Sequence, residues 1–163
     1  MIRVPKHLVG RRVGNNRIEL VSLLGEGSYG AVYRALVHRS GFRTPKECAV
    51  KVLRTAVGER DSTRQSMELE LHQRVSDCDG VVSLYETFSE GNYQFMVMKF
   101  CPDRDLGYGI SRNRYLGNDA KIKNVFTQVL DAIDYCHSHR YVPLFFSRLP
   151  PIKSSSWLQR ISS

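Results

Sequence analysis

The chain has 163 residues, a formal charge of +8, 42% hydrophobic residues and 25% charged residues. These values suit one soluble globular domain with a real core. No apolar run approaches the roughly 18 residues of a transmembrane helix, and the basic N-terminus lacks the apolar core of a secretory signal. We therefore expect an intracellular protein, cytoplasmic or nuclear, with no membrane partner.

The positive charge is scattered along the chain and makes no dense run. It lacks the basic, aromatic-interleaved stripe that binds single strands, so no specific nucleic-acid partner is expected. The four cysteines lie far apart and form no CxxC pair, which indicates separate reduced thiols and no zinc or disulfide framework. They are Cys48, Cys78, Cys101 and Cys136.

Three strands are predicted in the first part of the chain, after a basic, loose extension at residues 1–16. Residues 18–24 alternate enough for a strand, and residues 31–37 form the next one. The glycine-rich connection between them makes a hairpin. A turn at residues 40–45 leads to a third strand at residues 47–53, an apolar run that contains one lysine.

A helix is predicted from about Asp61 to Asp77, because apolar residues recur every four positions between polar ones. Asp61 or Ser62 is expected to cap its start. The apolar positions are Met67, Leu71 and Val75.

Two further strands are predicted at residues 81–88 and 93–100, joined by a turn at residues 89–92. After the irregular residues 101–105, a long helix begins after Asn118 or Asp119. Its apolar stripe consists of Ile122, Val125, Phe126, Val129, Ile133 and Cys136. This order lacks regular strand–helix alternation, so an α+β fold is favoured over a doubly wound parallel sheet.

The glycine-rich stretch at residues 25–33 reads GEGSYGAVY. A P-loop is excluded because no Lys-Ser or Lys-Thr follows the glycines. A Rossmann fingerprint is excluded because a strand, not a helix, follows them. The remaining pattern is GxGxxGxV between two strands with a lysine in the third strand, here Lys51 in Ala49-Val-Lys51. An ordinary hairpin turn is the alternative.

These spaced features resemble the small lobe of a eukaryotic protein kinase of the serine/threonine type, from about Arg17 to His139. The runs ELELH at residues 68–72 and LYETF at residues 84–88 support the resemblance. It implies a five-stranded antiparallel sheet with one helix, then a hinge and the first long helix of the large lobe. The expected divisions are residues 1–16 as an extension, 17–100 as the small lobe, 101–139 as hinge and large-lobe start, and 140–163 as an irregular or disordered tail.

The resemblance implies ATP as the ligand, with Mg²⁺ expected for the family. Gly25, Gly27 and Gly30 would let backbone N–H groups approach the phosphates, and Lys51 would meet the α- and β-phosphates. A carboxylate must hold that lysine. Glu68 is favoured by the family's E-x-x-L-H pattern, while Glu70 lies on a different helix face and suits a solvated position better.

The resemblance also places the base and the ribose. Met98 would be the gatekeeper behind the adenine, and Lys99 and Cys101 would offer backbone groups to its edge. Asp105 either accepts ribose hydroxyls or caps the following short helix. The residues expected along the adenine are Leu24, Val32 and Ala49.

The family's H-R-D-x-x-x-x-N and D-F-G motifs are expected just after the long helix. Instead, residues 140–163 contain no Asp, Glu or Asn. We therefore expect no metal ligands and no phosphate transfer from this chain as written, and Lys51 with Glu68 as the only part of the catalytic set.

Two alternatives remain open at this point. One is a pseudokinase-like or basic interaction module. The other is an incorrectly spliced gene product, because Arg-Tyr-Val after His139 can be encoded at an intron boundary. In either case the apolar stripe of the long helix is expected to need a partner or a chaperone, and a protein substrate is implied by the family alone.

Overall fold

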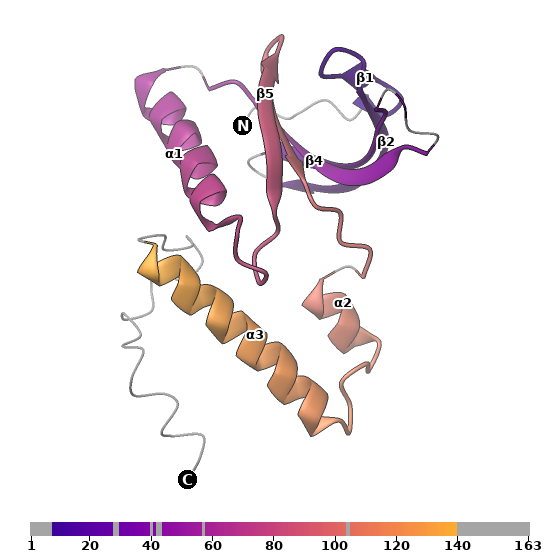
Figure 1. The fold of residues 1–163 in the computed structure, drawn as a ribbon, viewed down its shortest axis with the longest axis vertical. Coiled ribbons are helices and arrows are strands. Elements are labelled where there is room, and N and C mark those ends of the chain that lie inside the picture. Colours follow the sequence, from indigo (N-terminus) through magenta and orange to yellow (C-terminus); the bar gives the residue numbers. More distant parts are fainter. Residues whose placement is uncertain are drawn as a thin grey trace.

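The computed structural model shows a curled sheet with one helix beside it (Figure 1). Two further helices follow the last strand and lie below the sheet in this view. Half of the predicted turn at residues 40–45 falls outside the described residues, and the segment at residues 140–163 lies wholly outside them. The described residues are 8–27, 30–39, 41, 44–56, 58–103 and 105–139.

The sheet has six antiparallel strands among the described residues, in the order β1-β2-β3-β4-β6-β5. The five predicted strands are present, with their ends shifted by up to three residues. Their bounds are β1 Arg12–Val13, β2 Ile18–Gly27, β3 Gly30–Val37, β4 Lys46–Arg54, β5 Leu84–Glu90 and β6 Tyr93–Met98.

The sixth strand, β1, lies in the stretch that we predicted to be a loose extension, and that prediction is wrong for its described part. Val13 pairs with Ile18 of β2. Leu8 and Val13 are only 2% and 4% exposed, and both join the hydrophobic core. Burial of these two side chains holds the segment against the sheet, because removing apolar surface from water is the main force available to so short a strand.

Alternation along the strands separates the sheet into two faces. In β3 every second residue is buried, as expected for a period of two. The core face collects Ile18, Leu20, Ala31, Tyr33, Ala35, Val37, Cys48, Val50, Val52, Phe95 and Val97. The residues between them, which include Val32, Ala49 and Lys51, therefore point to the opposite face.

The two ends of the strand order are brought together by the curl of the sheet. The Gly14 backbone N–H donates to Glu90 Oε2 at 2.8 Å, and Arg17 pairs with Glu86 at 3.2 Å. A Cβ on Gly14 would lie 3.0 Å from the ring of Phe88. The turn after β1 thus rests directly on β5, and the curl leaves a continuous core inside.

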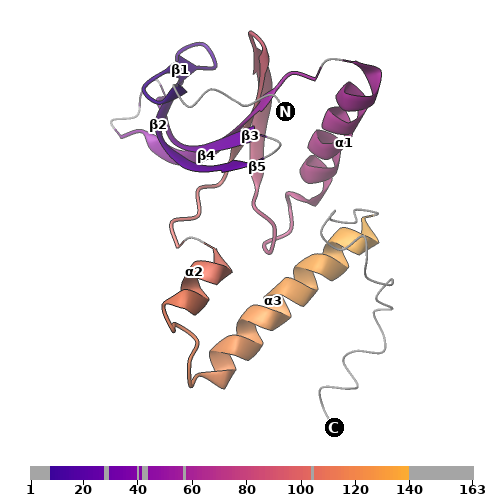
Figure 2. The same cartoon turned by 180° about the vertical axis from the view of Figure 1, so that it is seen from behind.

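Helix α1, Glu59–Val75, runs beside β5 (Figures 1 and 2). It begins two residues earlier than predicted, and the predicted caps Asp61 and Ser62 are wrong. The N-cap residue is Gly58, with φ of 105° and no side-chain capping bond. Ser62 lies inside the first turn, where its Oγ donates to the Glu59 carbonyl at 3.1 Å.

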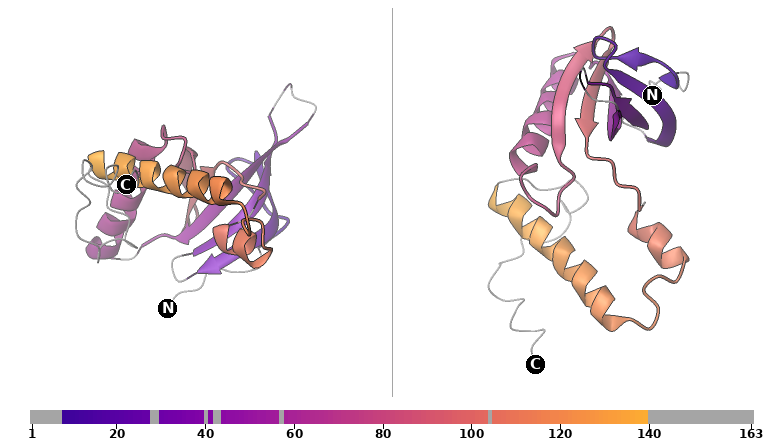
Figure 3. Two further views of the ribbon diagram at one scale, coloured as in Figure 1. Left: turned by 90° about the horizontal axis from the view of Figure 1, so that it is seen from below. Right: turned by 45° about the vertical axis from the view of Figure 1, so that its right-hand side comes forward.

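Two helices follow the hinge, α2 at Leu106–Ser111 and α3 at Asp119–Ser138. The predicted cap of α3 is confirmed, since Asn118 Oδ1 accepts from the Lys121 N–H at 2.9 Å. The C-terminal end of α3 lies near the C-terminal end of α1 in each view (Figure 3). Within the described part of the chain, no helix combines the length and apolar character needed to cross a membrane.

Candidate nucleotide site

The glycine-rich stretch forms the closing end of the β2–β3 hairpin. Gly25 pairs with Val32, and Gly27 pairs with Gly30; residues 28 and 29 lie outside the described part. A Cβ on Gly25 or Gly27 would meet nothing within 4 Å. The packing of the chain itself therefore does not require glycine at these two positions, and their backbone borders open space.

Gly30 differs from the other two glycines. Its φ is +155°, and a Cβ there would overlap the Val52 carbonyl oxygen. L-residues with a side chain rarely adopt this conformation. Gly30 is thus needed for the fold, whereas Gly25 and Gly27 leave open space beside the hairpin.

Lys51 occupies the centre of the sheet, on the face opposite the core. Its register partners are Val32 on β3 and Met96 on β6. Its Nζ forms an ion pair with Glu68 Oε1 of α1, with 24% and 40% of the two side chains exposed. Because both partners contact solvent, the pair itself stabilises the fold by about 1 kcal/mol at most.

Glu70, the competing carboxylate, lies on another side of α1. It pairs with Arg74 at 2.6 Å, and both of these side chains are more than half exposed. The two glutamates of the ELELH run are thus separated by helix geometry, since residues two apart do not share a face. Of the two, Glu68 is the one in contact with Lys51.

Three of the expected adenine residues, Val32, Ala49 and Met98, lie on the same face as Lys51. Ala49 lies directly opposite Met98 in the register, and they are 8% and 9% exposed. Val32 is half-buried, and Leu24 on β2 is 49% exposed. Ala49 and Met98 thus place a small side chain next to a flexible thioether on this face.

The hinge is tied to the segment before β5. The Lys99 N–H donates to the Ser83 carbonyl at 2.9 Å, so the backbone group of Lys99 that could meet a ligand is its carbonyl. Cys101 is exposed. Asp105 Oδ1 accepts from the Tyr108 N–H at 2.7 Å as the N-cap of α2, which is the capping role that we considered.

Two further kinds of chemical group in the described part of the chain are metal-ligating side chains and cysteine thiols. Among the described residues, no group of three or more His, Cys, Asp or Glu side chains could hold a metal ion. All four cysteines are free thiols. Burial, with Glu86 nearby, raises the pKa of the Cys48 thiol to about 11, and burial raises that of Cys136. Neither buried thiol is therefore an activated nucleophile at neutral pH.

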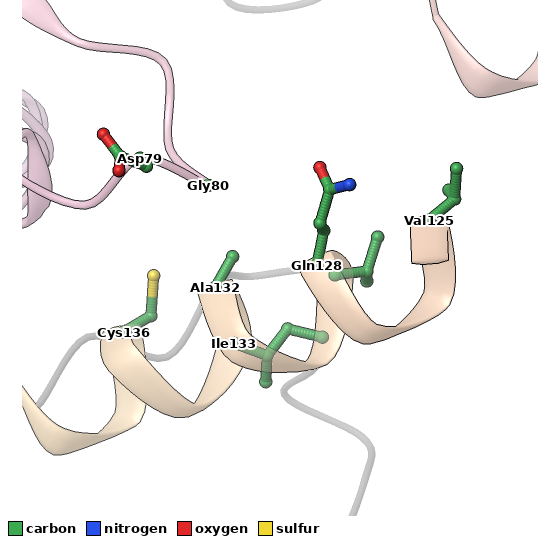
Figure 4. A pocket seen from close by; sticks show the side chains of 8 residues that line it. Asp79, Gly80, Val125, Gln128, Ala132, Ile133 and Cys136 are labelled. Atoms are coloured by element: carbon green, nitrogen blue, oxygen red, sulfur yellow. The ribbon is translucent and has the colours of Figure 1, made fainter. Parts of the chain in front are cut away.

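A hollow between α3 and the loop after α1 was not predicted from the sequence (Figure 4). A Cβ on Gly80 would lie 2.7 Å from the Cβ of Ala132, so loop and helix are in close contact there. The glycine in the Asp79-Gly80 pair was the available signal. The lining residues are Asp79, Gly80, Val125, Gln128, Val129, Ala132, Ile133 and Cys136.

The family was established by comparison with known proteins. Residues 18–143 match the family model described as protein kinase domain. The chain belongs to the protein kinase family. The predicted resemblance to the serine/threonine kinases is confirmed, as is the α+β small-lobe fold.

Similar proteins include the fission yeast (Schizosaccharomyces pombe) negative regulator of sexual conjugation and meiosis, 34% identical over 82% of this chain and 28% of that protein. The Candida glabrata carbon catabolite-derepressing protein kinase is 28% identical over 82% of this chain and 21% of that protein. The human NUAK family SNF1-like kinase 1 is 29% identical over 78% and 19%. The chain thus spans less than a third of the length of each of these three relatives.

Proposed function

We propose that this chain forms the ATP-binding lobe of a serine/threonine protein kinase. The observation that carries the proposal is the Lys51–Glu68 ion pair, set on the sheet face opposite the core and beside the open backbone of Gly25 and Gly27. A strand lysine held by a helix carboxylate is what an ATP-dependent kinase needs to fix the α- and β-phosphates.

In this proposal the residues act in two groups. Lys51 binds phosphate oxygens while Glu68 keeps its ammonium in place, and the N–H groups of the hairpin cover the phosphates. Gly30 supports that cover by letting β3 approach β4. Leu24, Val32, Ala49 and Met98 enclose the base, and the Lys99 carbonyl with the Cys101 N–H binds its edge.

Asp105 is the member of the proposed site for which two roles are considered. One of its carboxylate oxygens caps α2, which leaves the other oxygen to accept a ribose hydroxyl. This assignment keeps both roles that the sequence allowed, because a carboxylate offers two acceptor atoms.

The activity of the whole protein is part of the same proposal: transfer of the ATP γ-phosphate to a protein serine or threonine, with Mg²⁺ as the metal. The described residues provide the lysine–glutamate pair but no cluster of metal-ligand side chains. We therefore assign nucleotide binding to this chain and assign no transfer step to its residues. The four free thiols support an intracellular location, in cytoplasm or nucleus.

Nucleotide binding is tested by the shift of the melting temperature on adding ATP. We expect ATP to raise it in the wild type and not in Lys51→Ala. Lys46→Ala is the matched control, because Lys46 starts the same strand, is exposed, and lies over the ring of Tyr85 at 4.9 Å. An ATP shift that survives Lys51→Ala unchanged would overturn the proposed site.

The carboxylates offer a second matched pair on one helix. Glu68→Ala is expected to weaken ATP binding about tenfold, the equivalent of one hydrogen bond to a charged group. Glu70→Ala removes the same charge from an exposed position and should leave affinity within twofold or so. Equal losses in both variants would mean that net charge, not the pair, is responsible. A wild type without any ATP response would favour a basic interaction module instead.

A further inference from the structure

Four polar side chains lie along one side of α1. Gln65, Glu68, His72 and Ser76 follow one another at intervals of three, four and four residues, and this spacing places them on a common face of the helix. Glu68 is the carboxylate that meets Lys51. The other three form hydrogen bonds to segments that precede or follow the helix, and these contacts hold it at both ends.

Gln65 holds the N-terminal half of α1. Its Nε2 donates to the Arg54 carbonyl at 3.2 Å, and its Oε1 accepts from the Ala56 N–H at 3.1 Å. Arg54 is the last residue of β4, the strand that carries Lys51. The amide therefore joins α1 to the exit of that strand through two bonds of fixed geometry.

His72 holds the C-terminal half. Its Nε2 lies 2.8 Å from the Val82 carbonyl oxygen, and since a carbonyl only accepts, this nitrogen carries the donated hydrogen. Ser76 extends the contact one turn further: its Oγ donates to the His72 carbonyl at 2.9 Å and accepts from the Leu84 N–H at 3.0 Å. This end of α1 is thus joined to the start of β5.

Apolar packing contributes less to the placement of α1. Val75 is the one buried residue among the described side chains of the helix, and Met67 is 54% exposed. Because only one described side chain of this helix is fully buried, its polar contacts take a large share in fixing its rotation. The bonds of Gln65 and His72 fix it on either side of Glu68.

We propose that Gln65 and His72 are positioning residues that hold α1 at the rotation at which Glu68 meets Lys51. The proposal rests on the proposed nucleotide site and extends it to two further residues of α1, on either side of Glu68. Loss of one bond lets that half of the helix swing away from β4 or β5, and the Glu68 carboxylate then moves off the ammonium.

A double-mutant cycle separates positioning from a general structural role, because a residue acting through Glu68 has nothing left to act on once Glu68 is removed. ATP affinity is measured by calorimetry on the full chain. His72→Ala and Gln65→Ala are each expected to weaken binding about tenfold. In a Glu68→Ala background the same changes should alter affinity by no more than about twofold. Equal effects in both backgrounds would overturn the proposal.

Two control variants complete the design. Gln73→Ala removes an amide from an exposed position of the same helix and should leave affinity unchanged. His72→Gln keeps a nitrogen donor for the Val82 carbonyl and should restore most of the binding that His72→Ala loses. Failure of His72→Gln to recover any affinity would contradict a role through this hydrogen bond.

A readout without nucleotide keeps this proposal apart from the proposed function. The ¹³C shift of the Glu68 carboxylate is recorded in labelled wild type and in Lys51→Ala, which gives the paired and unpaired values. His72→Ala and Gln65→Ala should move the signal toward the unpaired value, and Gln73→Ala should not. If the wild type fails to bind ATP, the nucleotide site is wrong, while this shift still decides the positioning. A signal that keeps its paired value in both variants would overturn it.

Discussion

The sheet and the α2–α3 region use similar apolar side chains with opposite results. In the sheet, twelve residues form a core with exposures of 9% or less, and Leu8 joins them. In α2, α3 and the turn between them, large apolar side chains remain exposed by 41% or more. They are Leu106, Ile110, Leu116, Ile122, Phe126 and Val129.

Connectivity explains the difference. The four inner strands of the sheet each pair with two neighbours, and the segment around β1 contacts the other edge strand, β5. Alternating residues of the strands are therefore buried inside the curled sheet. A helix buries its stripe only against another element, and α3 has the loop at residues 79–80 over a few positions. The sheet therefore provides stability within the described residues, whereas α3 offers an apolar surface. That a partner covers this surface stays a prediction.

The largest expected effect compares two leucine truncations. Leu20 is fully buried in the core and Leu116 is 80% exposed. Leu20→Ala should lower the free energy of unfolding by about 2–5 kcal/mol, and Leu116→Ala should change it by less than about 0.5 kcal/mol. Urea titration followed by circular dichroism measures both. Similar losses of unfolding free energy in both variants would show that α2 and α3 unfold together with the sheet core.

The sheet could be predicted well from the sequence because its signals are local. Alternation and turn residues mark the five longer strands, and Asn118 marks the start of α3. The two-residue β1 escaped because it is too short to show a period. The start of α1 was wrong because Gly58 gives no side-chain cap to recognise. Both misses lack a local signal, and the burial of Val13 in the core becomes apparent only in the folded sheet.

The candidate site was predicted by pattern rather than by geometry. The motif from Gly25 to Lys51 predicted the family, and that prediction is confirmed. The ligand-binding roles of the individual residues stay predictions. That Glu68 and not Glu70 meets Lys51 depends on how α1 is rotated. Neither the ELELH run, which contains His72, nor the Asp79-Gly80 pair indicates which residue it contacts, and Gln65 lies in no motif. The contacts of all three are with other elements of the fold.

A smaller effect sharpens the comparison within one hairpin. Gly30→Ala places a Cβ against the Val52 carbonyl at a φ of +155°, and it should destabilise the fold by about 1–3 kcal/mol. Gly25→Ala meets open space, so it should leave stability nearly unchanged and lower ATP affinity. Thermal melts with and without ATP distinguish the two. Destabilisation by Gly25→Ala would mean that this glycine, too, serves the fold.

The junction between the two regions is tested at Gly80. Gly80→Ala should push α3 from the loop, since the added Cβ would lie 2.7 Å from that of Ala132, and we expect a cost of about 1–2 kcal/mol. Amide exchange in α3 should quicken while exchange in the sheet stays slow. Combining it with Ala132→Gly returns the space and should restore slow exchange. No rescue by the double variant would place the strain elsewhere.

The smallest change in stability at neutral pH is expected at the thiol of Cys48. This thiol packs in the sheet core, whereas the thiol of Cys101 is exposed. Burial raises the pKa of Cys48 from 9.0 to about 11. A raised folded-state pKa contributes stability that is full below pH 9 and is lost as the pH rises through about 11. We therefore expect the wild type to lose stability between these values, and Cys48→Ala to lose less over the same range.

Thiol labelling in the same pH series reports the reason for that loss. Cys101 should react with a disulfide reagent at once at pH 8, because it is exposed, whereas Cys48 should react only when the core opens. As the pH rises toward 11, labelling of Cys48 should accelerate together with unfolding measured by circular dichroism. Rapid labelling of Cys48 at pH 8 in a chain that keeps its circular dichroism would mean that the curled sheet opens locally. The contrast between a closed sheet and an exposed α3 would then no longer hold.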